Sequence, residues 1–378
     1  MDFRLSQEQQ QFSDSLRRWT EKDYTFEKRK TIVYSDTGVS SAAWQALANL
    51  GSTALPVPEE QGGLNGSAVD MMIVMKELGR GLVVEPYFAT MLGTEFLKKT
   101  GGHEILEKVA SGDAKLACAL SERESGHELF NIGMTAKANG GGYVLNGEKT
   151  VVIHGAQADG LIVSARTSGE QRDKKGISLF FVPTGTQGVS CCDYRTFDGQ
   201  RAADITFANV QLASSALLGQ VDLGWDVLDE VSDYGVVLLC SEAVGAMEAA
   251  NSATLEYLKT REQFGVPIGT FQVLQHRMAD MYIHLEQSRS ITTLAVVRVS
   301  STDAQERRQK VSAAKARVGQ AMKYIGQQAV QMHGGMGMSN ELPISHYFKR
   351  MTAIELTLGN TDHHLARFIE QPGFTEDV

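Results

Sequence analysis

Apolar residues recur at helical spacing along the first part of the chain, from residue 6 to residue 110. Glu8 to Tyr24 and Ser41 to Leu50 are amphipathic at this spacing, and Met71 to Leu82 continues the pattern. Gly51 and the prolines at 56 and 58 interrupt it, as glycine and proline commonly do between elements. This pattern predicts an N-terminal helical domain.

Between residues 115 and 220 the apolar pattern changes to short runs with frequent glycines. Tyr143 to Lys149 contains an Asn-Gly pair between two strand-like runs, which predicts a hairpin turn at that pair. Ile177 to Val182 is a short apolar run closed by Pro183, and Asp204 to Phe207 alternates between polar and apolar residues. The polar stretch from Thr167 to Lys175 predicts a solvated loop. We therefore expect a β-rich middle domain, either a small barrel or a sandwich.

From Gly224 onward the helical period returns with few breakers, which favours an antiparallel bundle. The expected helices are Trp225 to Thr260, Thr270 to Ser300, Asp303 to Gln331 and Leu342 to Glu370. The predicted fold class is α+β, mainly α. It comprises an N-terminal helical domain (1–112), a middle β-barrel (113–222) and a C-terminal four-helix bundle (223–378).

Composition and charge limit the classes of function that we expect for the protein. The 378 residues carry a formal net charge of -9, so we expect no nucleic-acid footprint. We expect no secretory signal and no membrane helix, because no stretch approaches about 18 uninterrupted apolar residues. The four cysteines form no CxxC pair, so reduced thiols, a cytoplasmic location and no metal are expected.

Three separated segments carry a family resemblance. Leu55 to Gly63 contains a PEExGG-like run, and Lys259 to Gln275 resembles TRxQFGxPI followed by FQ. Gln331 to Gly337 resembles QxxGGxG. In this order the motifs resemble those of the acyl-CoA dehydrogenase family, most closely the small subunits of bacterial pimeloyl-CoA-type dehydrogenases. The resemblance covers nearly the whole chain.

The resemblance implies the three-part fold expected above and an FAD cofactor held between two subunits. It implies α,β-desaturation of an acyl-CoA thioester. In that reaction a glutamate removes the α-proton and the β-hydrogen leaves as hydride to the flavin. Two hydrogen bonds to the thioester carbonyl stabilise the developing charge, one of them from a backbone N–H.

In this family each subunit contributes residues to the FAD site of its neighbour, and the residues at those positions in this sequence match the family pattern. Arg261 corresponds to the arginine that binds the diphosphate, a role that suits a guanidinium. Paired glycines allow a close backbone approach to the ligand. The matching positions around the adenine and diphosphate are Phe264, Gln272, Gln331, Gly334 and Gly335.

The flavin-ring side departs from the family pattern. Leu120 and Ser121 match the loop over the flavin, and Ser121 keeps a hydroxyl. Val151 stands where an aromatic residue is usual, and Ile153 stands where a threonine or serine bonds near N5. An isoleucine side chain has no hydrogen-bond donor. Asn360 and Asp362 are the remaining expected contacts to FAD.

The usual catalytic glutamate is absent, because Gly359 anchors the alignment and places Leu358 at that position. The backbone N–H of Leu358 is still available to the thioester carbonyl. The alternative base position of the family falls on Gly235. Glu242 lies seven residues later on about the same helical face and is the best substitute base. It could instead recognise a polar acyl group, or be solvated or paired. Weaker substitutes are Glu355 and Asp362, and His363 and His364 are expected at the surface or an interface rather than at a metal.

Several functional hypotheses remain open. In the first, the chain is the base-lacking subunit of a heteromeric acyl-CoA dehydrogenase whose partner supplies the base. In the second, it is an active homo-oligomer, a dimer or tetramer, that uses Glu242. The third is a non-catalytic flavin- or acyl-CoA-binding scaffold, and the fourth a flavin-dependent oxidase or oxygenase on the same fold. A medium-chain or dicarboxylyl substrate and an electron-transferring flavoprotein as acceptor are implied by the resemblance alone.

Overall fold

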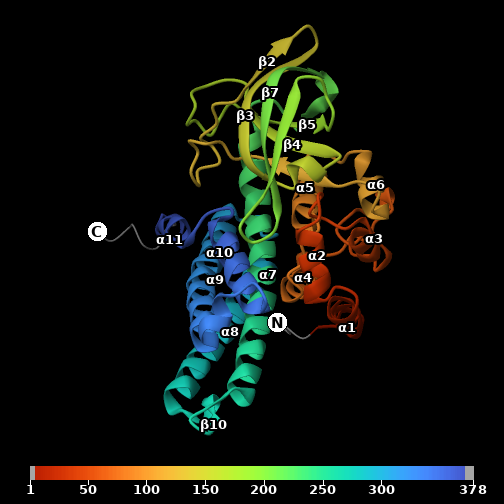
Figure 1. Cartoon of the computed structure of the whole chain (residues 1–378). Helices are drawn as coiled ribbons and strands as arrows, with labels where there is room; N and C mark the ends of the chain where they lie inside the picture. Colours follow the sequence, from red (N-terminus) through yellow and green to blue (C-terminus); the bar gives the residue numbers. More distant parts are fainter. Residues whose placement is uncertain (1–4, 371–378) are drawn as a thin grey trace, which may run out of the picture. The chain divides into compact units, whose positions relative to one another are not determined.

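A computed structural model describes residues 5–370, whose elements are shown in Figure 1. The chain divides into two compact units. The helical unit combines residues up to 31, residues 68–83 and residues from 236 onward. The β unit combines residues 32–67 and 84–235. The predicted order of helices, β-strands and helices is confirmed. The predicted domain boundaries at 112 and 222 stay a prediction.

Helices of the helical unit bury one apolar stripe each. On α9 the buried positions Val311, Ala314, Val318 and Ile325 follow the 3.6-residue period. The Asp303 side chain caps the start of this helix by accepting the N–H groups of residues 305 and 306. The elements are α1 (Gln7–Lys22), α4 (Ala68–Arg80), α8 (Gln272–Arg298), α9 (Ala304–His333), α10 (Pro343–Leu356), α11 (Thr361–Ile369) and the later part of α7 (Gly224–Thr260).

Two glycines allow α4 and α7 to approach closely within this unit. A Cβ atom on Gly79 would lie 2.0 Å from the carbonyl oxygen of Glu242. A Cβ atom on Gly245 would lie 1.8 Å from the carbonyl oxygen of Lys76. Only a residue without a side chain fits at either position. The Tyr347 hydroxyl on α10 donates to the carbonyl of Arg80 at 2.5 Å and ties a third helix to this crossing.

The predicted single helix from Leu342 to Glu370 is wrong, because α10 ends at Leu356 and α11 begins at Thr361. Leu358 has φ 53° and Gly359 has φ 97°, and two successive left-handed residues cannot continue an α-helix. The Asn360 side chain then caps α11 by accepting the N–H of His363. The prediction followed the apolar period and passed over Gly359 and Asn360, which are common residue types just after a helix end and at the start of the next helix.

His364 was expected at the surface or an interface, and that expectation is wrong. Its ring is 1% exposed and bonds the carbonyl of Leu358 at 2.9 Å. The other ring nitrogen lies 3.3 Å from the Ser312 hydroxyl of α9. Burial and the charge of Lys315 hold the pKa of His364 well below its usual value. Gly359 makes room for this ring, because a Cβ atom there would lie 2.7 Å from Nε2.

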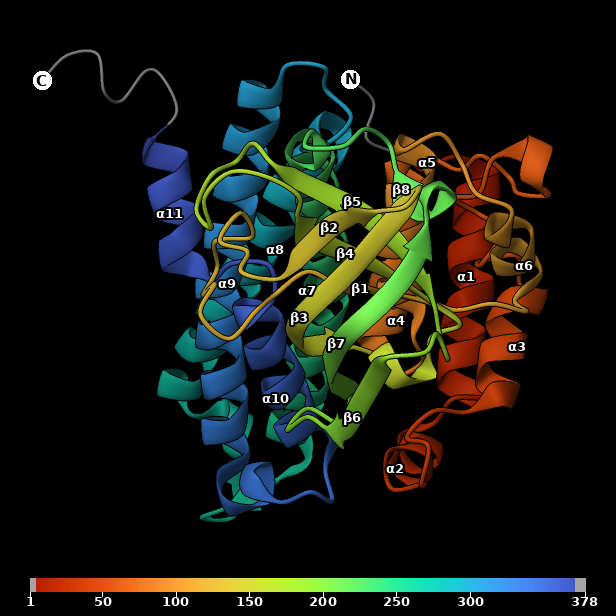
Figure 2. The ribbon, with the colours of Figure 1, turned by 90° about the horizontal axis from the view of Figure 1, so that it is seen from above.

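One eight-stranded sheet forms the middle of the β unit, and Figure 2 shows its strands side by side. The strand order is β6-β7-β3-β2-β4-β5-β8, and β1 pairs with β4 in parallel. Buried apolar residues of six strands and the connecting loops form its core, among them Leu145, Val163, Phe180 and Phe207. The strands are β1 (Leu116–Ala119), β2 (Thr135–Asn139), β3 (Gly142–Ile153), β4 (Gly160–Arg166), β5 (Ile177–Pro183), β6 (Val189–Arg195), β7 (Arg201–Ala213) and β8 (Leu217–Leu218).

The hairpin predicted at Asn146-Gly147 is wrong, because β3 runs through both residues. The turn between β2 and β3 lies earlier, where Asn139 pairs with Gly142. Gly147 sits instead at a shift in the register between β3 and β7 and has φ 145°. Asn146 accepts the N–H of Asn209 at 2.8 Å through its side chain. The residue types that favour a two-residue turn also suit a β-bulge, and pairing with β7 decided between them.

Short helices complete the β unit. Trp44 on α3 donates to the carbonyl of Gly112 at 2.7 Å, and Tyr87 on α5 donates to the carbonyl of Ser52 at 2.8 Å. The first bond fixes the loop that leads from α6 into β1, and the second fixes the loop that follows α3. The elements are α2 (Phe26–Val33), which crosses into the helical unit, α3 (Ser41–Asn49), α5 (Tyr87–Lys99) and α6 (Ile105–Ser111). Among the described residues, no helix combines the length and apolar character needed to cross a membrane.

Candidate functional site

Two segments expected to serve a neighbouring subunit's cofactor meet at one end of the helical unit. Tyr257 near the end of α7 stacks on His333 at the end of α9, with ring centroids 4.3 Å apart. The Tyr257 carbonyl also accepts the N–H of Arg261 at 2.8 Å. The segment around Arg261 and the glycines that follow His333 are therefore brought together, as the motif pattern predicted.

Phe264 occupies the turn of a small hairpin between β9 (Glu262–Gln263) and β10 (Val266–Pro267). Phe264 has φ 56° and Gly265 has φ 80°, which is typical of a two-residue type I′ turn. The Phe264 side chain is 93% exposed. A bulky residue held in the left-handed region costs on the order of 1–3 kcal/mol and indicates a functional contact. This geometry fits a side chain presented to a ligand or a neighbouring subunit.

The chemistry of this end fits the diphosphate and adenosine part of FAD. Arg261 is exposed, and its guanidinium forms no ion pair with any residue of the described range 5–370. Gly334 has φ 61°, and a Cβ atom on Gly334 or Gly335 would meet nothing within 4 Å. The two glycines thus form an open cradle beside an available cation, and Gln272 and Gln331 are exposed amides close by in sequence.

The flavin-side residues of the β unit are also brought together. The loop carrying Leu120 and Ser121 lies against β3, because the N–H of Thr150 donates to the Ser121 carbonyl at 2.9 Å. The Lys149 ammonium donates to the Leu120 carbonyl at 3.3 Å. Leu120 is buried and Ser121 is half-buried. The sequence pattern placed these positions in one site, and the structure places them side by side.

A buried ion pair holds this loop in place. Lys149 is fully buried and donates to Glu122 at 2.8 Å and to the Ser164 hydroxyl at 3.1 Å. Glu122 in turn accepts the N–H of Gly133 at 2.8 Å. Burial lowers the pKa of Lys149, and the nearby Glu122 carboxylate partly offsets that effect. The loop over the flavin position is therefore anchored by a network that was not predicted.

Val151 and Ile153 lie near the end of β3, and their side chains have no hydrogen-bond donors. Val151 has φ 53°, is 54% exposed, and donates its N–H to Asp204 at 3.0 Å. Ile153 is half-buried at the end of β3, where it pairs with Ala202. At these two positions, which the resemblance places beside the flavin ring, the side chains offer apolar contact only. The hydroxyl of Ser121 is the polar side-chain group that the pattern predicted here.

Residue 358, where the family resemblance places the usual base, lies in the turn between α10 and α11. Leu358 is half-buried there with φ 53°. The Lys315 ammonium of α9 donates to the carbonyls of Thr357 at 2.8 Å and Gly359 at 2.6 Å on either side of it. Asn360 uses its side-chain oxygen to cap α11, and Asp362 is exposed in the first turn of that helix. The cofactor roles expected for these last two residues stay predictions.

Glu242 is a buried, paired carboxylate. Arg350 of α10 donates Nε to Oε1 at 2.5 Å and a terminal nitrogen to Oε2 at 2.8 Å. Glu242 is 4% exposed and Arg350 is 8% exposed. This bidentate geometry favours the paired interpretation over an isolated base in an apolar pocket. Its role as a substitute base stays a prediction that mutagenesis has to test.

Glu355 is engaged near the same turn. Its Oε1 accepts the N–H of Thr361 at 2.8 Å and so helps to cap α11. Its Oε2 is buried without a hydrogen-bond partner in the described part of the chain. That oxygen lies against Gly319, where a Cβ atom would come within 2.2 Å of it. The carboxylate is thus directed at α9 and α11.

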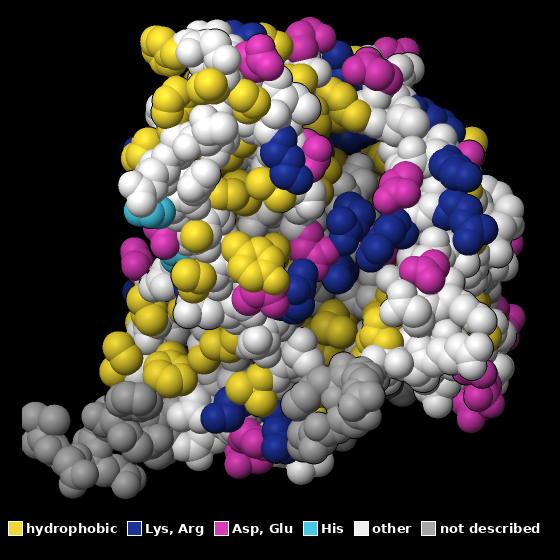
Figure 3. Space-filling view, turned by 90° about the horizontal axis from the view of Figure 1, so that it is seen from below, with side chains coloured by type: hydrophobic (Ala, Val, Ile, Leu, Met, Phe, Trp, Pro, Cys, Tyr) yellow, Lys and Arg dark blue, Asp and Glu magenta, His cyan; other side chains and the backbone are white. Residues whose placement is uncertain are grey.

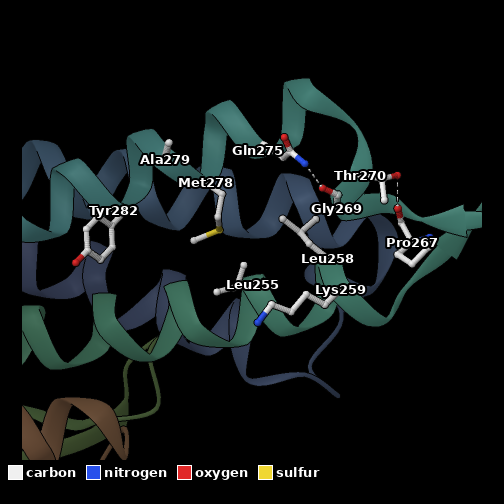
Figure 4. Close-up of a pocket in the computed structure, with 10 residues that line it drawn as sticks. All are labelled: Leu255, Leu258, Lys259, Pro267, Gly269, Thr270, Gln275, Met278, Ala279 and Tyr282. Carbon is white, nitrogen blue, oxygen red and sulfur yellow. Dashed lines mark hydrogen bonds between the residues drawn. The ribbon is translucent and has the colours of Figure 1, made fainter.

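An apolar pocket of about 670 Å³ lies between α7 and α8 at the same end as Arg261 (Figure 4). Leu255, Leu258, Met278 and Tyr282 form its walls. The polar side chain of Gln275 is turned to the connecting loop, where it donates to the Gly269 carbonyl at 2.9 Å. Large apolar side chains continue outside the pocket and are 37–93% exposed, namely Phe264, Val266, Phe271, Val273 and Ile283.

Exposed apolar side chains also lie among lysines and arginines on the face seen from below in Figure 3. Contiguous exposed apolar surface commonly marks an interaction site. The sequence pattern does not reveal this pocket, because its walls come from two helices that each show an ordinary apolar stripe. Nor does it reveal the roles of Lys315 and Arg350, because a lysine or arginine in an amphipathic helix carries no sign of its own burial.

Family models match the chain in three consecutive parts. The acyl-CoA dehydrogenase N-terminal domain matches residues 6–114, the middle domain matches residues 117–212, and the C-terminal domain matches residues 222–371. A mitochondrial isovaleryl-CoA dehydrogenase of Solanum tuberosum is 32% identical over 366 residues, with 94% of this chain and 88% of that protein covered.

Solved structures with the same fold include a chain of the ChsE4–ChsE5 complex from Mycobacterium tuberculosis. It superimposes with a TM-score of 0.88 at 26% identity and covers 97% of each chain. The FAD complex of PigA gives a TM-score of 0.90 at 26% identity, with 99% of this chain and 100% of that chain covered. Both similarities extend over the helices and the sheet alike.

Proposed function

The chain belongs to the acyl-CoA dehydrogenase family, and from this premise we propose that it is an FAD-dependent oxidoreductase subunit that binds an acyl-CoA thioester without carrying its own catalytic base. FAD, when bound, supplies the hydride acceptor. The protein supplies binding, orientation and the polar contacts. Within the chain, the base position is occupied by Leu358, and leucine has no group that accepts a proton.

The residues that would hold FAD fall into the two groups described above. Arg261 would pair with the diphosphate, and Gly334 and Gly335 would admit it close to the backbone. Leu120 and Ser121 would lie at the flavin ring, on a loop anchored by Lys149. The group that includes Arg261 is rich in polar hydrogen-bond donors, whereas the group at the flavin ring has apolar side chains at positions 151 and 153. This asymmetry supports a subunit that mainly completes a neighbour's cofactor site.

One observation carries the proposal: the turn around Leu358 is held in a defined geometry although position 358 carries no base. Leu358 is left-handed and is flanked by two carbonyls that Lys315 binds. A left-handed leucine is costly, so a turn without a function would be expected to relax. The geometry supports thioester binding at the backbone of this turn, as in a dehydrogenase, with proton removal assigned to another subunit.

An assembly with a second chain follows from this assignment. The large exposed apolar side chains around the α7–α8 pocket support a covered surface in the working protein. The relative in the ChsE4–ChsE5 structure is part of a two-component complex, which supports a heteromer for this chain as well. The acyl chain of the substrate follows from none of these observations.

The decisive experiment adds a panel of acyl-CoA thioesters anaerobically to the FAD-loaded chain and follows the flavin absorbance. We expect no bleaching with the parent chain. We expect slow bleaching with Leu358→Glu, which places a carboxylate at the usual base position. General bases typically contribute 10²–10⁴-fold, so a gain of about 100-fold or more is expected even from imperfect geometry. Leu358→Gln is the matched control and should not bleach.

Two outcomes contradict the proposal. Rapid bleaching of the parent chain by itself means that the chain carries a base elsewhere. Failure of both the parent chain and Leu358→Glu to bind any acyl-CoA, measured by calorimetry, means that the chain is not an acyl-CoA-binding subunit. Binding without bleaching in Leu358→Glu and in every assembly tested points to a scaffold without a redox role.

A further inference from the structure

Lys315 is a buried cation surrounded by backbone carbonyls. It is fully buried on α9, and its ammonium donates to the carbonyls of Ile354 at 2.9 Å, Glu355 at 3.2 Å, Thr357 at 2.8 Å and Gly359 at 2.6 Å. An ammonium has three N–H donors, so these acceptors saturate it. The Lys315 ammonium therefore binds the carbonyls at the end of α10 and in the turn that follows.

Because each peptide unit is planar, a carbonyl held by Lys315 also fixes the direction of the N–H group of the next residue. In a trans peptide the C=O of one residue and the N–H of the next point in opposite directions, and no cis peptide is present in the described chain. The Thr357 carbonyl faces Lys315, so the N–H of Leu358 faces away from it. The Gly359 carbonyl also faces Lys315, which turns the N–H of Asn360 outward.

His364 completes the arrangement from α11. It bonds the Leu358 carbonyl at 2.9 Å, so the N–H of Gly359 points away from that ring. In residues 5–370 the N–H groups of Leu358 and Asn360 have no hydrogen-bond partner, and both residues are half-buried, whereas Gly359 between them is buried. The donors of Leu358 and Asn360 are thus kept available, and free N–H groups in a turn favour an oxyanion or a polarised carbonyl.

We propose that Lys315 is a positioning residue that holds the 357–360 turn so that its free N–H groups bind the thioester carbonyl oxygen. This inference rests on the proposed function. Lys315 does not touch the substrate, and it acts by fixing the opposite side of the same peptide planes. A neutral residue of similar size would fill the same space, but it would leave the carbonyls of Glu355, Thr357 and Gly359 without this donor and the turn free to rotate.

The protonation of Lys315 makes its hold on the 357–360 turn dependent on pH. Burial lowers the pKa of Lys315 to about 8, although Cys240 and Glu355 nearby oppose the shift. Cys240 on α7 has a pKa raised to about 12 by burial, and the pKa of His364 on α11 lies well below its usual value. Neither the thiol nor the imidazole therefore changes charge between pH 7 and 9, where Lys315 loses its proton.

The test compares binding of octanoyl-CoA with binding of its thioether analogue octyl-CoA, which lacks the carbonyl, to the FAD-loaded chain. We expect the parent to prefer the thioester by about 10-fold or more, as one or two hydrogen bonds provide. Lys315→Met should reduce this preference to about one while affinity for octyl-CoA stays as in the parent. Lys323→Met, at an exposed position of the same helix, is the matched control and should keep the preference.

The failures of the test are distinguishable. A preference in Lys315→Met equal to that of the parent overturns the inference and leaves the proposed function standing. Equal affinity of the parent for the two ligands does the same, because the carbonyl is then not recognised. A parent that binds neither ligand overturns the proposed function, and the inference falls with it.

A second measurement uses the unmodified protein, so it remains informative if Lys315→Met does not fold. Between pH 7 and 9 the preference of the parent for octanoyl-CoA should fall severalfold, because neutral Lys315 binds the carbonyls of the 357–360 turn less strongly. Affinity for octyl-CoA serves as the internal reference at each pH. A preference that stays constant over this range counts against the positioning role.

Discussion

Leu358 and Glu242 show how one residue's chemistry depends on its neighbours. Leu358 has no proton-accepting group, although Lys315 holds the backbone on either side of it in place. Glu242 keeps a carboxylate, but Arg350 binds both of its oxygens. A buried ion pair is strongly destabilised when one partner is removed, because the remaining charge is left uncompensated. The sequence shows the glutamate, whereas only the structure shows the arginine.

Glu242→Gln is expected to destabilise the protein by about 3–5 kcal/mol, because it leaves Arg350 charged and buried. The double variant Glu242→Gln with Arg350→Met should recover a large part of that loss. Urea unfolding of the two single variants and the double variant measures the coupling. A Glu242→Gln variant that keeps its stability within about 1 kcal/mol while flavin reduction falls 100-fold or more would instead identify Glu242 as the base.

At the scale of elements, the close crossing of α4 and α7 depends on two small residues. Gly79 and Gly245 each place a backbone carbonyl of the other helix where a side chain would begin. The ion pairs around Glu248, which bonds Lys76 of α4 at 2.9 Å, lie next to this crossing. The helices therefore cannot separate slightly to admit a methyl group without disturbing a buried charge.

Gly79→Ala and Gly245→Ala are each expected to lower the free energy of unfolding by about 1–3 kcal/mol, the usual cost of overpacking. Gly335→Ala is the matched control, because a Cβ atom there meets nothing within 4 Å. Thermal and urea unfolding should show the loss in the first two variants and almost none in the third. Equal stability of all three variants would show that the crossing has room to adjust.

The α10–α11 break belongs to the same scale. Sequence periodicity predicted one helix, although the residue that α11 buries is His364 rather than an apolar stripe. What interrupts the helix is the binding of four carbonyls by Lys315 on another helix, together with the space that Gly359 leaves for His364. The contacts of Lys315 join residues 39 to 44 positions apart, so a local sequence window cannot reveal them.

At the scale of the whole molecule, the arrangement at the end of the helical unit supports cofactor binding in trans. Arg261, Phe264 and the cradle of Gly334 and Gly335 are all presented outward at one end. Such exposure is unfavourable for Phe264 in an isolated chain, since 93% of its side chain meets solvent. An assembly in which a neighbour's cofactor covers these residues removes that cost.

Arg261→Ala is expected to weaken FAD binding by the assembled protein about 10–100-fold, the usual effect of losing a hydrogen bond to a charged group. The ratio of flavin to protein absorbance after dialysis measures this, and the free energy of unfolding of the flavin-free chain should not change. Arg172→Ala, in the exposed loop of the β unit, is the control. Unchanged flavin content in Arg261→Ala would remove this residue from the cofactor site.

The sequence by itself determined the family, the succession of helices, strands and helices, and the absence of a carboxylate at position 358. These depend on motif order, on periodicity and on residue identity, all of which are local properties of the chain. The positions of Leu120, Ser121, Arg261 and the paired glycines followed from motif matching, and the structure brings each of the two groups together.

The tertiary structure decided the rest. It placed Asn146-Gly147 inside a strand, broke the last helix at Leu358, buried His364, paired Glu242 with Arg350 and directed Lys315 at a ring of carbonyls. Each of these outcomes depends on which distant group satisfies a buried charge, ring or backbone donor. A buried polar group must find its partner in space rather than along the chain. For that reason the sequence shows which groups are available, and the packing determines which of them meet.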